Sequence, residues 1–148
     1  MPSLARIRFA GLLLALTGAH GFAADIEDIF HAEDTNGDGA ISVDEARVVA
    51  PANFLRIDRD ASGGVEAQEI AEFTAAESCP DGVWPADVLA SVARKTLEYW
   101  DGNRDGKVTE AEYADAAVAL MLLADADGNR EVTREELQRF RGEAASPR

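Results

Sequence analysis

Four twelve-residue segments of this chain carry oxygen-bearing side chains at the same spacing. The first of them, residues 34–45, has the sequence DTNGDGAISVDE. Its positions 1, 3, 5, 9 and 12 hold carboxylate, amide or hydroxyl groups, and position 7 offers its main-chain carbonyl. Oxygen ligands of this kind favour hard cations such as calcium and disfavour zinc or copper. The first expectation is therefore a metal-binding loop.

Each position of this first loop has a separate physical task. The short side chains point inward from a tight turn, position 9 holds or replaces a water molecule, and Glu45 reaches back to bind the ion through both carboxylate oxygens. Gly39 at position 6 supplies the positive φ that the turn requires. The candidate ligands are Asp34, Asn36, Asp38, Ala40 through its carbonyl, Ser42 and Glu45.

The second and third loops repeat the pattern. Residues 58–69, DRDASGGVEAQE, supply four carboxylates, one more than the first loop, and this charge predicts that the second loop is among the tightest. Its candidate ligands are Asp58, Asp60, Ser62, Gly64 through its carbonyl, Glu66 and Glu69. In residues 101–112, DGNRDGKVTEAE, the charges of Arg104 and Lys107 weaken binding slightly by repulsion. The candidate ligands there are Asp101, Asn103, Asp105, Lys107 through its carbonyl, Thr109 and Glu112.

The fourth loop, residues 125–136, has the sequence DADGNREVTREE and one clear defect. Arg130 stands where the other loops have glycine, and a left-handed conformation at such a residue costs roughly 1–2 kcal/mol, or about five- to thirty-fold in affinity. The sequence therefore predicts up to four calcium ions, with the loop at Asp125 the weakest. Its candidate ligands are Asp125, Asp127, Asn129, Glu131 through its carbonyl, Thr133 and Glu136.

The four loops form two similar pairs along the chain. Asp34 and Asp58 start 24 residues apart, as do Asp101 and Asp125, and the two pairs are offset by 67 residues, which indicates an internal duplication. Position 8 of every loop is β-branched and suits a short strand pairing between loops. These residues are Ile41, Val65, Val108 and Val132.

Repeated loops of this composition resemble those of the EF-hand superfamily. The resemblance covers nearly the whole chain after residue 23 and implies an all-α fold of helix–loop–helix pairs that form one compact helical domain. The 24-residue spacing is also similar to that of the lanmodulins, bacterial periplasmic EF-hand proteins whose family is known for lanthanide binding. The likeness is strongest over residues 101–136, where Glu112-Tyr113 ends one loop and leads through a short helix into the next.

Two departures from the lanmodulin pattern favour calcium over lanthanide(III) ions, which remain the alternative. Lanmodulin loops have proline at position 2, where this chain has Thr35, Arg59, Gly102 and Ala126. They also have aspartate at position 9, where this chain has Ser42, Glu66, Thr109 and Thr133.

Helices are expected to flank the loops, and one of them decides how the loops pair. Residues 113–124, YADAAVALMLLA, hold no helix breaker and predict a single helix of about 18 Å between loops 3 and 4. Loops at opposite ends of one helix cannot easily lie side by side, so we expect loop 1 to pair with loop 4 and loop 2 with loop 3. In the alternative, Pro51 splits the helix between loops 1 and 2 and allows consecutive loops to pair.

The sequence divides into four parts. Arg6, Arg8 and the uncharged run 9–22 predict an export signal at 1–23, cleaved near Ala23, and hence a periplasmic or secreted bacterial protein. Two pairs of loops, at 24–77 and 86–148, flank a linker at 78–85 that contains two prolines and a glycine. The uncharged run is too short to span a bilayer comfortably, and we expect no membrane insertion after it is cleaved off.

The charge of the chain restricts its partners. The full sequence has a formal net charge of −14, and removal of Arg6 and Arg8 from its 14 basic residues leaves 12 against 28 acidic ones, a net charge of −16. Such a charge repels nucleic acid and opposes compaction unless cations neutralise it. The expected partners are therefore metal ions, together with an unidentified protein if the protein is a calcium sensor.

The remaining candidate residues have structural explanations. Cys79 is the single cysteine and has no partner for an internal disulfide, His31 is expected at the surface or in the core, and Trp84 and Trp100 are expected to anchor the core. No nucleophile with a base at a recognisable spacing is present, so we expect a binding protein and not an enzyme.

A sensor would need an apolar groove, for which Val118, Leu120, Met121, Leu122 and Leu123 are candidates, although such a stripe is more often core. The alternatives are a calcium buffer that orders on binding metal, a lanthanide-binding protein and a metal-rigidified interaction module.

Overall fold

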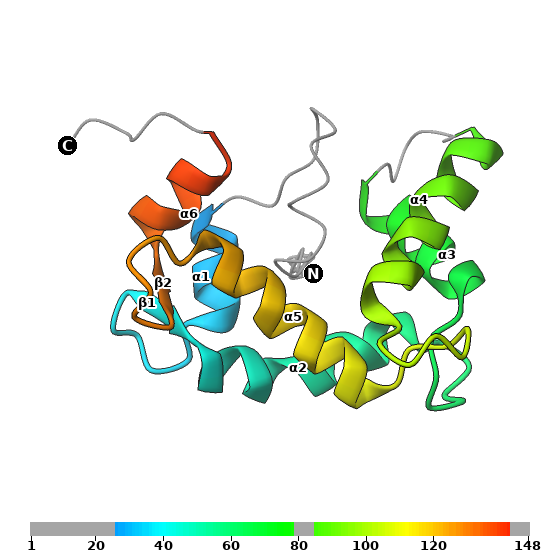
Figure 1. Cartoon of the computed structure of the whole chain (residues 1–148), viewed down its shortest axis with the longest axis horizontal. Coiled ribbons are helices and arrows are strands. Elements are labelled where there is room, and N and C mark those ends of the chain that lie inside the picture. Colours follow the sequence, from blue (N-terminus) through cyan, green and yellow to red (C-terminus); the bar gives the residue numbers. More distant parts are fainter. Residues whose placement is uncertain (1–25, 79–84, 143–148) are drawn as a thin grey trace, which may run out of the picture.

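The computed structural model describes residues 26–78 and 85–142 of the chain (Figure 1). Within these residues the fold is helical, as predicted, and the strands are short. The elements are α1 (Ile26–Glu33), β1 (Ala40–Ser42), α2 (Val43–Ile57), α3 (Ala67–Ser78), α4 (Ala86–Trp100), α5 (Glu110–Ala124), β2 (Glu131–Thr133) and α6 (Arg134–Phe140). None of these helices combines the length and apolar character needed to cross a membrane. The predicted export signal, Cys79, Trp84 and most of the linker at 78–85 lie outside the described residues.

Two antiparallel helices, α2 and α5, form the middle of the molecule (Figure 1). Each has 15 residues and is therefore about 22 Å long. Helix α2 leads from loop 1 to loop 2, and α5 leads from loop 3 to loop 4. The single helix predicted over residues 113–124 is confirmed, and it begins three residues earlier, at Glu110. One pair of loops consequently lies at each end of the molecule.

The loops pair across the two halves of the sequence, as predicted. Strands β1 and β2 are antiparallel, with Ile41 opposite Val132, so loop 1 pairs with loop 4. An isolated antiparallel bridge joins Val65 to Val108, so loop 2 pairs with loop 3. All four position-8 side chains are fully buried, and they therefore stabilise the pairs by packing as well as by strand hydrogen bonds.

Pro51 does not split α2, so the alternative of consecutive pairing is wrong. The helix runs from Val43 to Ile57 with Pro51 inside it. A proline removes one helical hydrogen bond, but Ala50, Phe54 and Ile57 recur at helical spacing around it and are buried in one core. Burial of this apolar face offsets the lost bond and keeps the helix continuous.

Two hydrophobic cores lie under the two loop pairs, and α5 contributes to both. The 1–4 core consists of Ile26, Ile29, Phe30, Ile41, Ala46, Val118, Met121, Ala124, Val132 and Leu137. The 2–3 core consists of Ala50, Phe54, Ile57, Val65, Ile70, Phe73, Ala93, Trp100, Val108, Tyr113, Ala116 and Leu120. Each core draws on both halves of the sequence, so the division at 24–77 and 86–148 describes the order of the loops along the chain and not the packing.

Truncation of Met121 is expected to destabilise the protein much more than truncation of Leu123 on the same helix. Met121 is 0% exposed in the 1–4 core, whereas Leu123 is 60% exposed. Loss of a buried side chain of this size costs about 2–5 kcal/mol, so Met121→Ala should lower the urea midpoint followed by circular dichroism, while Leu123→Ala should leave it nearly unchanged. Equal effects of the two substitutions would contradict this placement of α5.

Candidate metal-binding loops

In all four loops, the aspartate at position 1 organises the turn. Its Oδ2 accepts a hydrogen bond from the backbone N–H of position 6. The bonds run from Gly39 to Asp34 (3.0 Å), Gly63 to Asp58 (3.0 Å), Gly106 to Asp101 (2.8 Å) and Arg130 to Asp125 (2.8 Å). The turn therefore wraps around a carboxylate, and the loop with arginine at position 6 adopts the same arrangement as the others.

The glutamate at position 12 connects the two ends of each loop. Its Oε2 accepts from the N–H of position 9, and its Oε1 accepts from an N–H at position 2 or 3. The first set of bonds runs from Ser42 to Glu45 (3.0 Å), Glu66 to Glu69 (3.0 Å), Thr109 to Glu112 (3.0 Å) and Thr133 to Glu136 (2.9 Å). The second set starts at Asn36 (3.0 Å), Arg59 (3.0 Å), Asn103 (3.1 Å) and Ala126 (3.1 Å). Each glutamate is thus already turned back into its loop, as a bidentate ligand must be.

Three of these glutamates also complete the first turn of the helix that follows the loop. Ser42, Thr109 and Thr133 are the N-caps of α2, α5 and α6, and each forms a capping box with the glutamate three residues later. The hydroxyl accepts from the glutamate N–H while the carboxylate accepts from the cap N–H, which stabilises the helix start. The same side chain therefore joins loop geometry to helix orientation. The S/T-x-x-E spacing of these residues is the sequence signal for the three helix starts.

Hydrogen bonds keep the position-12 carboxylates of loops 1 and 3, Glu45 and Glu112, ionised. Burial raises the pKa of Glu45, but bonds from the backbone of Ser42 and Asn36 and from the hydroxyls of Ser42 and Thr35 lower it to about 2. Backbone and hydroxyl bonds from Thr109 lower the pKa of Glu112. Each group is therefore a full negative charge at neutral pH, which suits it to bind a cation.

Loops 2 and 4 bring three carboxylates close enough to share one ion. Two oxygens that each lie about 2.4 Å from a calcium ion are at most about 4.8 Å apart. Within the described residues, oxygens from Asp58, Asp60 and Glu69, and likewise from Asp125, Asp127 and Glu136, all lie within 4.8 Å of one another. Loops 1 and 3 have asparagine at position 3 and supply an amide oxygen in place of that carboxylate. The residues present therefore fit a calcium ion in their donor chemistry.

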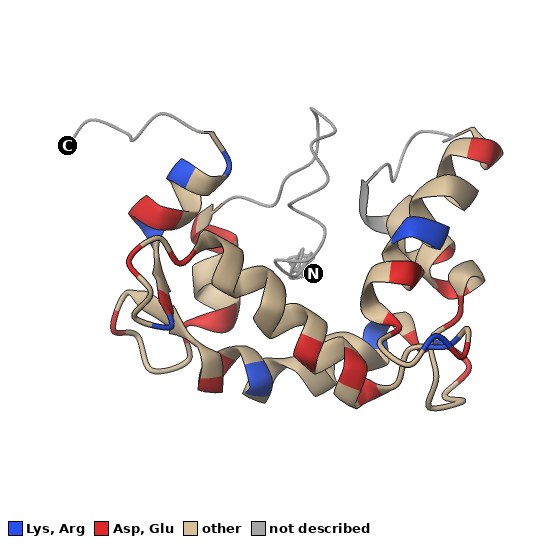
Figure 2. Ribbon diagram, viewed as in Figure 1, with Lys and Arg blue, Asp and Glu red and all other residues tan. Residues whose placement is uncertain are grey.

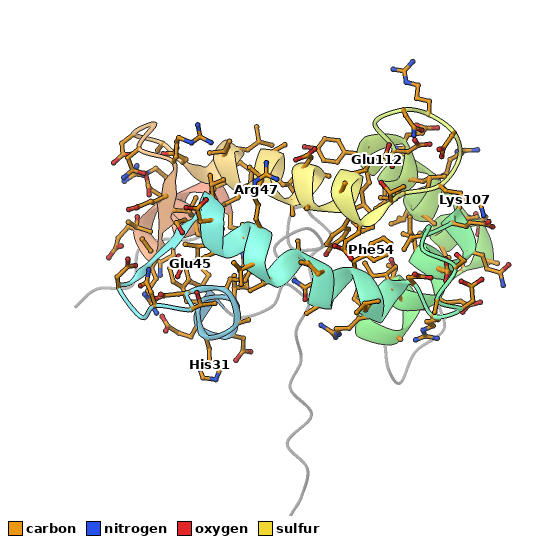
Figure 3. The ribbon with its side chains drawn as sticks, turned by 90° about the horizontal axis from the view of Figure 1, so that it is seen from below. His31, Glu45, Arg47, Phe54, Lys107 and Glu112 are labelled. Atoms are coloured by element: carbon orange, nitrogen blue, oxygen red, sulfur yellow. The ribbon has the colours of Figure 1, made fainter. Side chains whose placement is uncertain are left out.

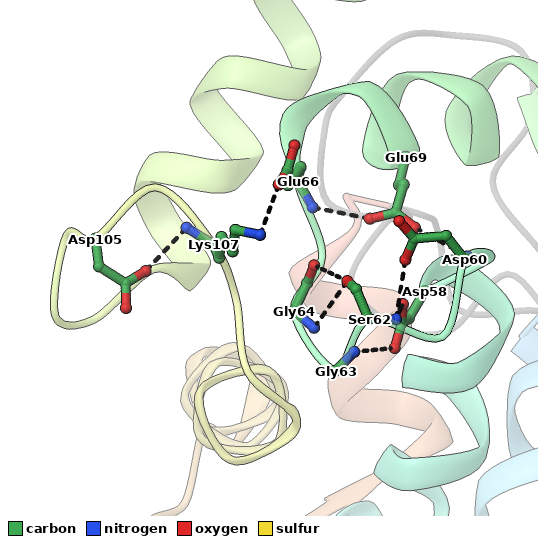
Figure 4. Close-up of polar contacts among 9 residues, drawn as sticks. All are labelled: Asp58, Asp60, Ser62, Gly63, Gly64, Glu66, Glu69, Asp105 and Lys107. Carbon is green, nitrogen blue, oxygen red and sulfur yellow. Dashed lines mark hydrogen bonds and ion pairs between the residues drawn. The ribbon is translucent and has the colours of Figure 1, made fainter.

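Glu66 of loop 2 is the predicted ligand that stands apart from its cluster. Its Oε1 lies 2.8 Å from Nζ of Lys107 in loop 3, and Figure 4 shows it directed toward that lysine. The hydrogen bond to Glu66 raises the pKa of Lys107. The high cation affinity expected for loop 2 depended on its fourth carboxylate, Glu66. In this structure that carboxylate forms an ion pair with Lys107.

The backbone has positive φ at two positions of each loop, whereas the loop pattern in the sequence predicts one. Position 6 has φ of 92° at Gly39, 80° at Gly63, 91° at Gly106 and 71° at Arg130. Position 4 has φ of 74° at Gly37, 56° at Ala61, 61° at Arg104 and 76° at Gly128. The glycines at 37 and 128 were the sequence signal for this second turn position.

Positive φ at position 4 adds backbone strain to loops 2 and 3. The φ values of Ala61 and Arg104 lie inside the left-handed region that side chains tolerate. Arg130 occupies position 6, where φ is close to 90° in loops 1 and 3. Loop 4 remains the most strained, but loops 2 and 3 also carry a non-glycine residue at positive φ. Of the four loops, all of which the structure describes, loop 1 has glycine at both positions.

An aromatic cluster closes the base of loop 3. Trp100 precedes the first ligand and Tyr113 follows the last, and their rings meet edge to face with centroids 5.2 Å apart. Phe54 of α2 packs on Tyr113 with ring centroids 6.0 Å apart. Trp100 is buried, as predicted, and any movement at the ends of loop 3 would change its surroundings.

All of the predicted ligands lie in the described residues, and the charge of the molecule follows the loops. Figure 2 shows aspartate and glutamate residues around the loops at both ends of the molecule. His31 is exposed and projects from α1 away from the body of the protein, in keeping with a surface histidine (Figure 3).

Comparison with known proteins supports this reading of the loops. Residues 26–48 match the family model of the EF hand. The chain is 27% identical over 140 residues to the calcium-binding allergen Ole e 8 of Olea europaea, which covers 78% of this chain and 80% of that protein. It is also 27% identical over 142 residues to calcium-binding protein A of Dictyostelium discoideum, covering 78% of this chain and 89% of the relative.

A third relative is an enzyme of which this chain spans a small part. The chain is 28% identical over 120 residues to calcium-dependent protein kinase 16 of Oryza sativa subsp. japonica, and the match covers 73% of this chain but 20% of the kinase. The helix–loop–helix geometry and these matches together support the resemblance of the chain to the EF-hand superfamily.

Replacement of Arg130 by glycine should tighten cation binding by loop 4. Release of the strained backbone at φ 71° is worth roughly 1–2 kcal/mol, or about five- to thirty-fold in affinity. Arg130→Met is the matched control, because it removes the same charge but keeps a side chain at the strained position. A site-resolved titration in which Arg130→Gly and Arg130→Met bind equally well would contradict the strain explanation.

Proposed function

We propose that this protein binds calcium ions in its four EF-hand loops and that the bound ions order the two loop pairs. The observation that carries the proposal is the shared geometry of the loops. In each one, the position-1 carboxylate accepts a hydrogen bond from the N–H of position 6. The position-12 carboxylate accepts from the N–H of position 9 and from an N–H at position 2 or 3, next to the first ligand. An ion placed among these oxygens would replace repulsion between carboxylates by attraction.

The choice of calcium has two supports. The donors are carboxylate, amide, hydroxyl and carbonyl oxygens, which suit a hard cation with six to eight ligands. The three relatives are each named for calcium, and the chain spans most of the length of two of them. We therefore infer a binding protein and not an enzyme, because the part of the kinase that matches is a fifth of its length.

Charge neutralisation supplies the physical reason for ordering by metal. The sequence has 28 acidic and 14 basic residues, and acidic side chains gather at the loops (Figure 2). Four divalent ions would supply eight positive charges, half of the −16 expected after loss of residues 1–23. Their effect would be greatest where the loop carboxylates converge, at the ends of α2 and α5.

We propose that the protein lies in the bacterial envelope and responds to the calcium concentration of that compartment. The support for this is the sequence of residues 1–23, and extracellular calcium modules of this type work at about 10⁻⁴–10⁻³ M. The apolar stripe considered for a sensor groove is largely core, since Val118, Leu120 and Met121 are buried. This burial favours a calcium-ordered buffer over a sensor that exposes the stripe, and an apolar dye that binds equally with and without calcium would agree with it.

The proposal is tested on residues 24–148, stripped of metal and titrated with calcium in millimolar magnesium. A Trp84→Phe variant leaves Trp100 as the single tryptophan, so that its fluorescence reports loop 3 while circular dichroism reports the helices. We expect a saturable rise in helicity and a change in Trp100 emission at about 10⁻⁴–10⁻³ M calcium.

The same titration with lanthanum distinguishes the alternatives. A response to lanthanum alone, with calcium inert below tens of millimolar, would contradict the calcium proposal in favour of a lanthanide(III)-binding protein. Full helicity without any metal would contradict ordering by ions and favour a preformed interaction module.

A further inference from the structure

Strand register places position 9 of one loop opposite position 7 of its partner. In the 1–4 pair, Ser42 is opposite Glu131 and Ala40 is opposite Thr133. The antiparallel bridge between Val65 and Val108 places Glu66 opposite Lys107 by the same geometry. Among the residues at these positions in the two pairs, Glu66 and Lys107 are the combination with opposite charges.

The contacts of Lys107 fit this register. Its Nζ lies 2.8 Å from Oε1 of Glu66, and both side chains are about half exposed. Its alkyl stem lies over Gly64, where an added Cβ would stand 3.3 Å from Cδ of the lysine. Because Gly64 has no side chain, the space beside it is open to the stem of Lys107, which reaches loop 2 through this space (Figure 4).

The ion pair separates Glu66 from the other acids of its loop. Oxygens of Asp58, Asp60 and Glu69 converge within 4.8 Å of one another, and Glu66 lies outside this group. Loop 2 therefore has three converging carboxylates, as does loop 4, although its sequence supplies four candidate carboxylate ligands.

We propose that Lys107 of loop 3 sets the effective charge of loop 2 by holding the Glu66 carboxylate away from the ion, and that it thereby lowers the affinity of loop 2 for cations and its preference for trivalent over divalent ions. This inference rests on the proposed function, because it assigns a regulator to one of the four loops. Lys107 then serves two loops: its carbonyl is the candidate ligand of loop 3, and its ammonium group restrains loop 2.

The effect on ion preference follows from electrostatics. The attraction between an ion and a carboxylate is proportional to the charge of the ion, so a trivalent ion gains about one and a half times as much free energy as a divalent ion from each added carboxylate. Removal of the lysine charge and release of Glu66 should consequently strengthen binding of both ions, and of the trivalent ion more.

The test is Lys107→Met, which keeps the length of the stem over Gly64 and removes the charge. In ¹⁵N-labelled protein, the amides of Gly63 and Gly106 report loops 2 and 3 separately, since each donates to the position-1 aspartate of its own loop. We expect loop 2 to bind calcium roughly three- to tenfold more tightly in the variant. On a logarithmic scale, the gain for lanthanum should be about one and a half times the gain for calcium.

Two further variants separate the ion pair from a general effect of charge. Arg104→Met removes another positive charge from loop 3, and it should leave the calcium affinity of loop 2 within about twofold of wild type. In a Glu66→Gln background there is no carboxylate to release, so Lys107→Met should then gain less than about twofold.

A failure of the role given to Lys107 can be told apart from a failure of the proposed function. If no loop of the wild-type protein binds calcium, the proposed function is wrong. If loop 2 binds calcium but Lys107→Met leaves its affinity and its lanthanum-to-calcium ratio unchanged, the regulatory role of Lys107 is wrong. The same conclusion follows if the gain persists in full in the Glu66→Gln background.

Discussion

The length of α5 is the constraint on which the rest of the structure depends. This 15-residue helix joins loop 3 directly to loop 4 and holds them about 22 Å apart. Because α2 separates loops 1 and 2 in the same way, loop 1 cannot pair with loop 2, and loop 3 cannot pair with loop 4. Each loop pairs instead with one from the other half, and the two cores form where the pairs meet. The paired loops therefore start 91 residues apart (loops 1 and 4) or 43 residues apart (loops 2 and 3) in the sequence.

The position-12 glutamates transmit loop geometry to the helices. Glu45, Glu112 and Glu136 are each a candidate ligand and the third residue of a capped helix. A change at the ion site therefore reaches the start of α2, α5 or α6 through one side chain. Loop 2 is different, because Glu66 occupies the place of the capping hydroxyl and binds Lys107 of the partner loop. The 2–3 pair is consequently joined by a charged contact as well as by its strand bridge.

Local patterns and helix length made much of the fold predictable from the sequence. The ligand spacing located all four loops, the unbroken run at 113–124 predicted α5, and its length predicted the cross-pairing. Features that depend on side-chain contacts between two segments were not predictable in this way. The ion pair between Glu66 and Lys107 needs the register of the bridge, and the tolerance of Pro51 needs the core that its helix covers. Positive φ at Ala61 and Arg104 was missed because neither residue type signals it.

The cross-pairing is tested most directly by nuclear Overhauser effects across the loop pairs in isotope-labelled, calcium-loaded protein. We expect backbone contacts between Ile41 and Val132 and between Val65 and Val108. Contacts between Ile41 and Val65, and between Val108 and Val132, would mean that consecutive loops pair, and they would contradict the role given to α2 and α5.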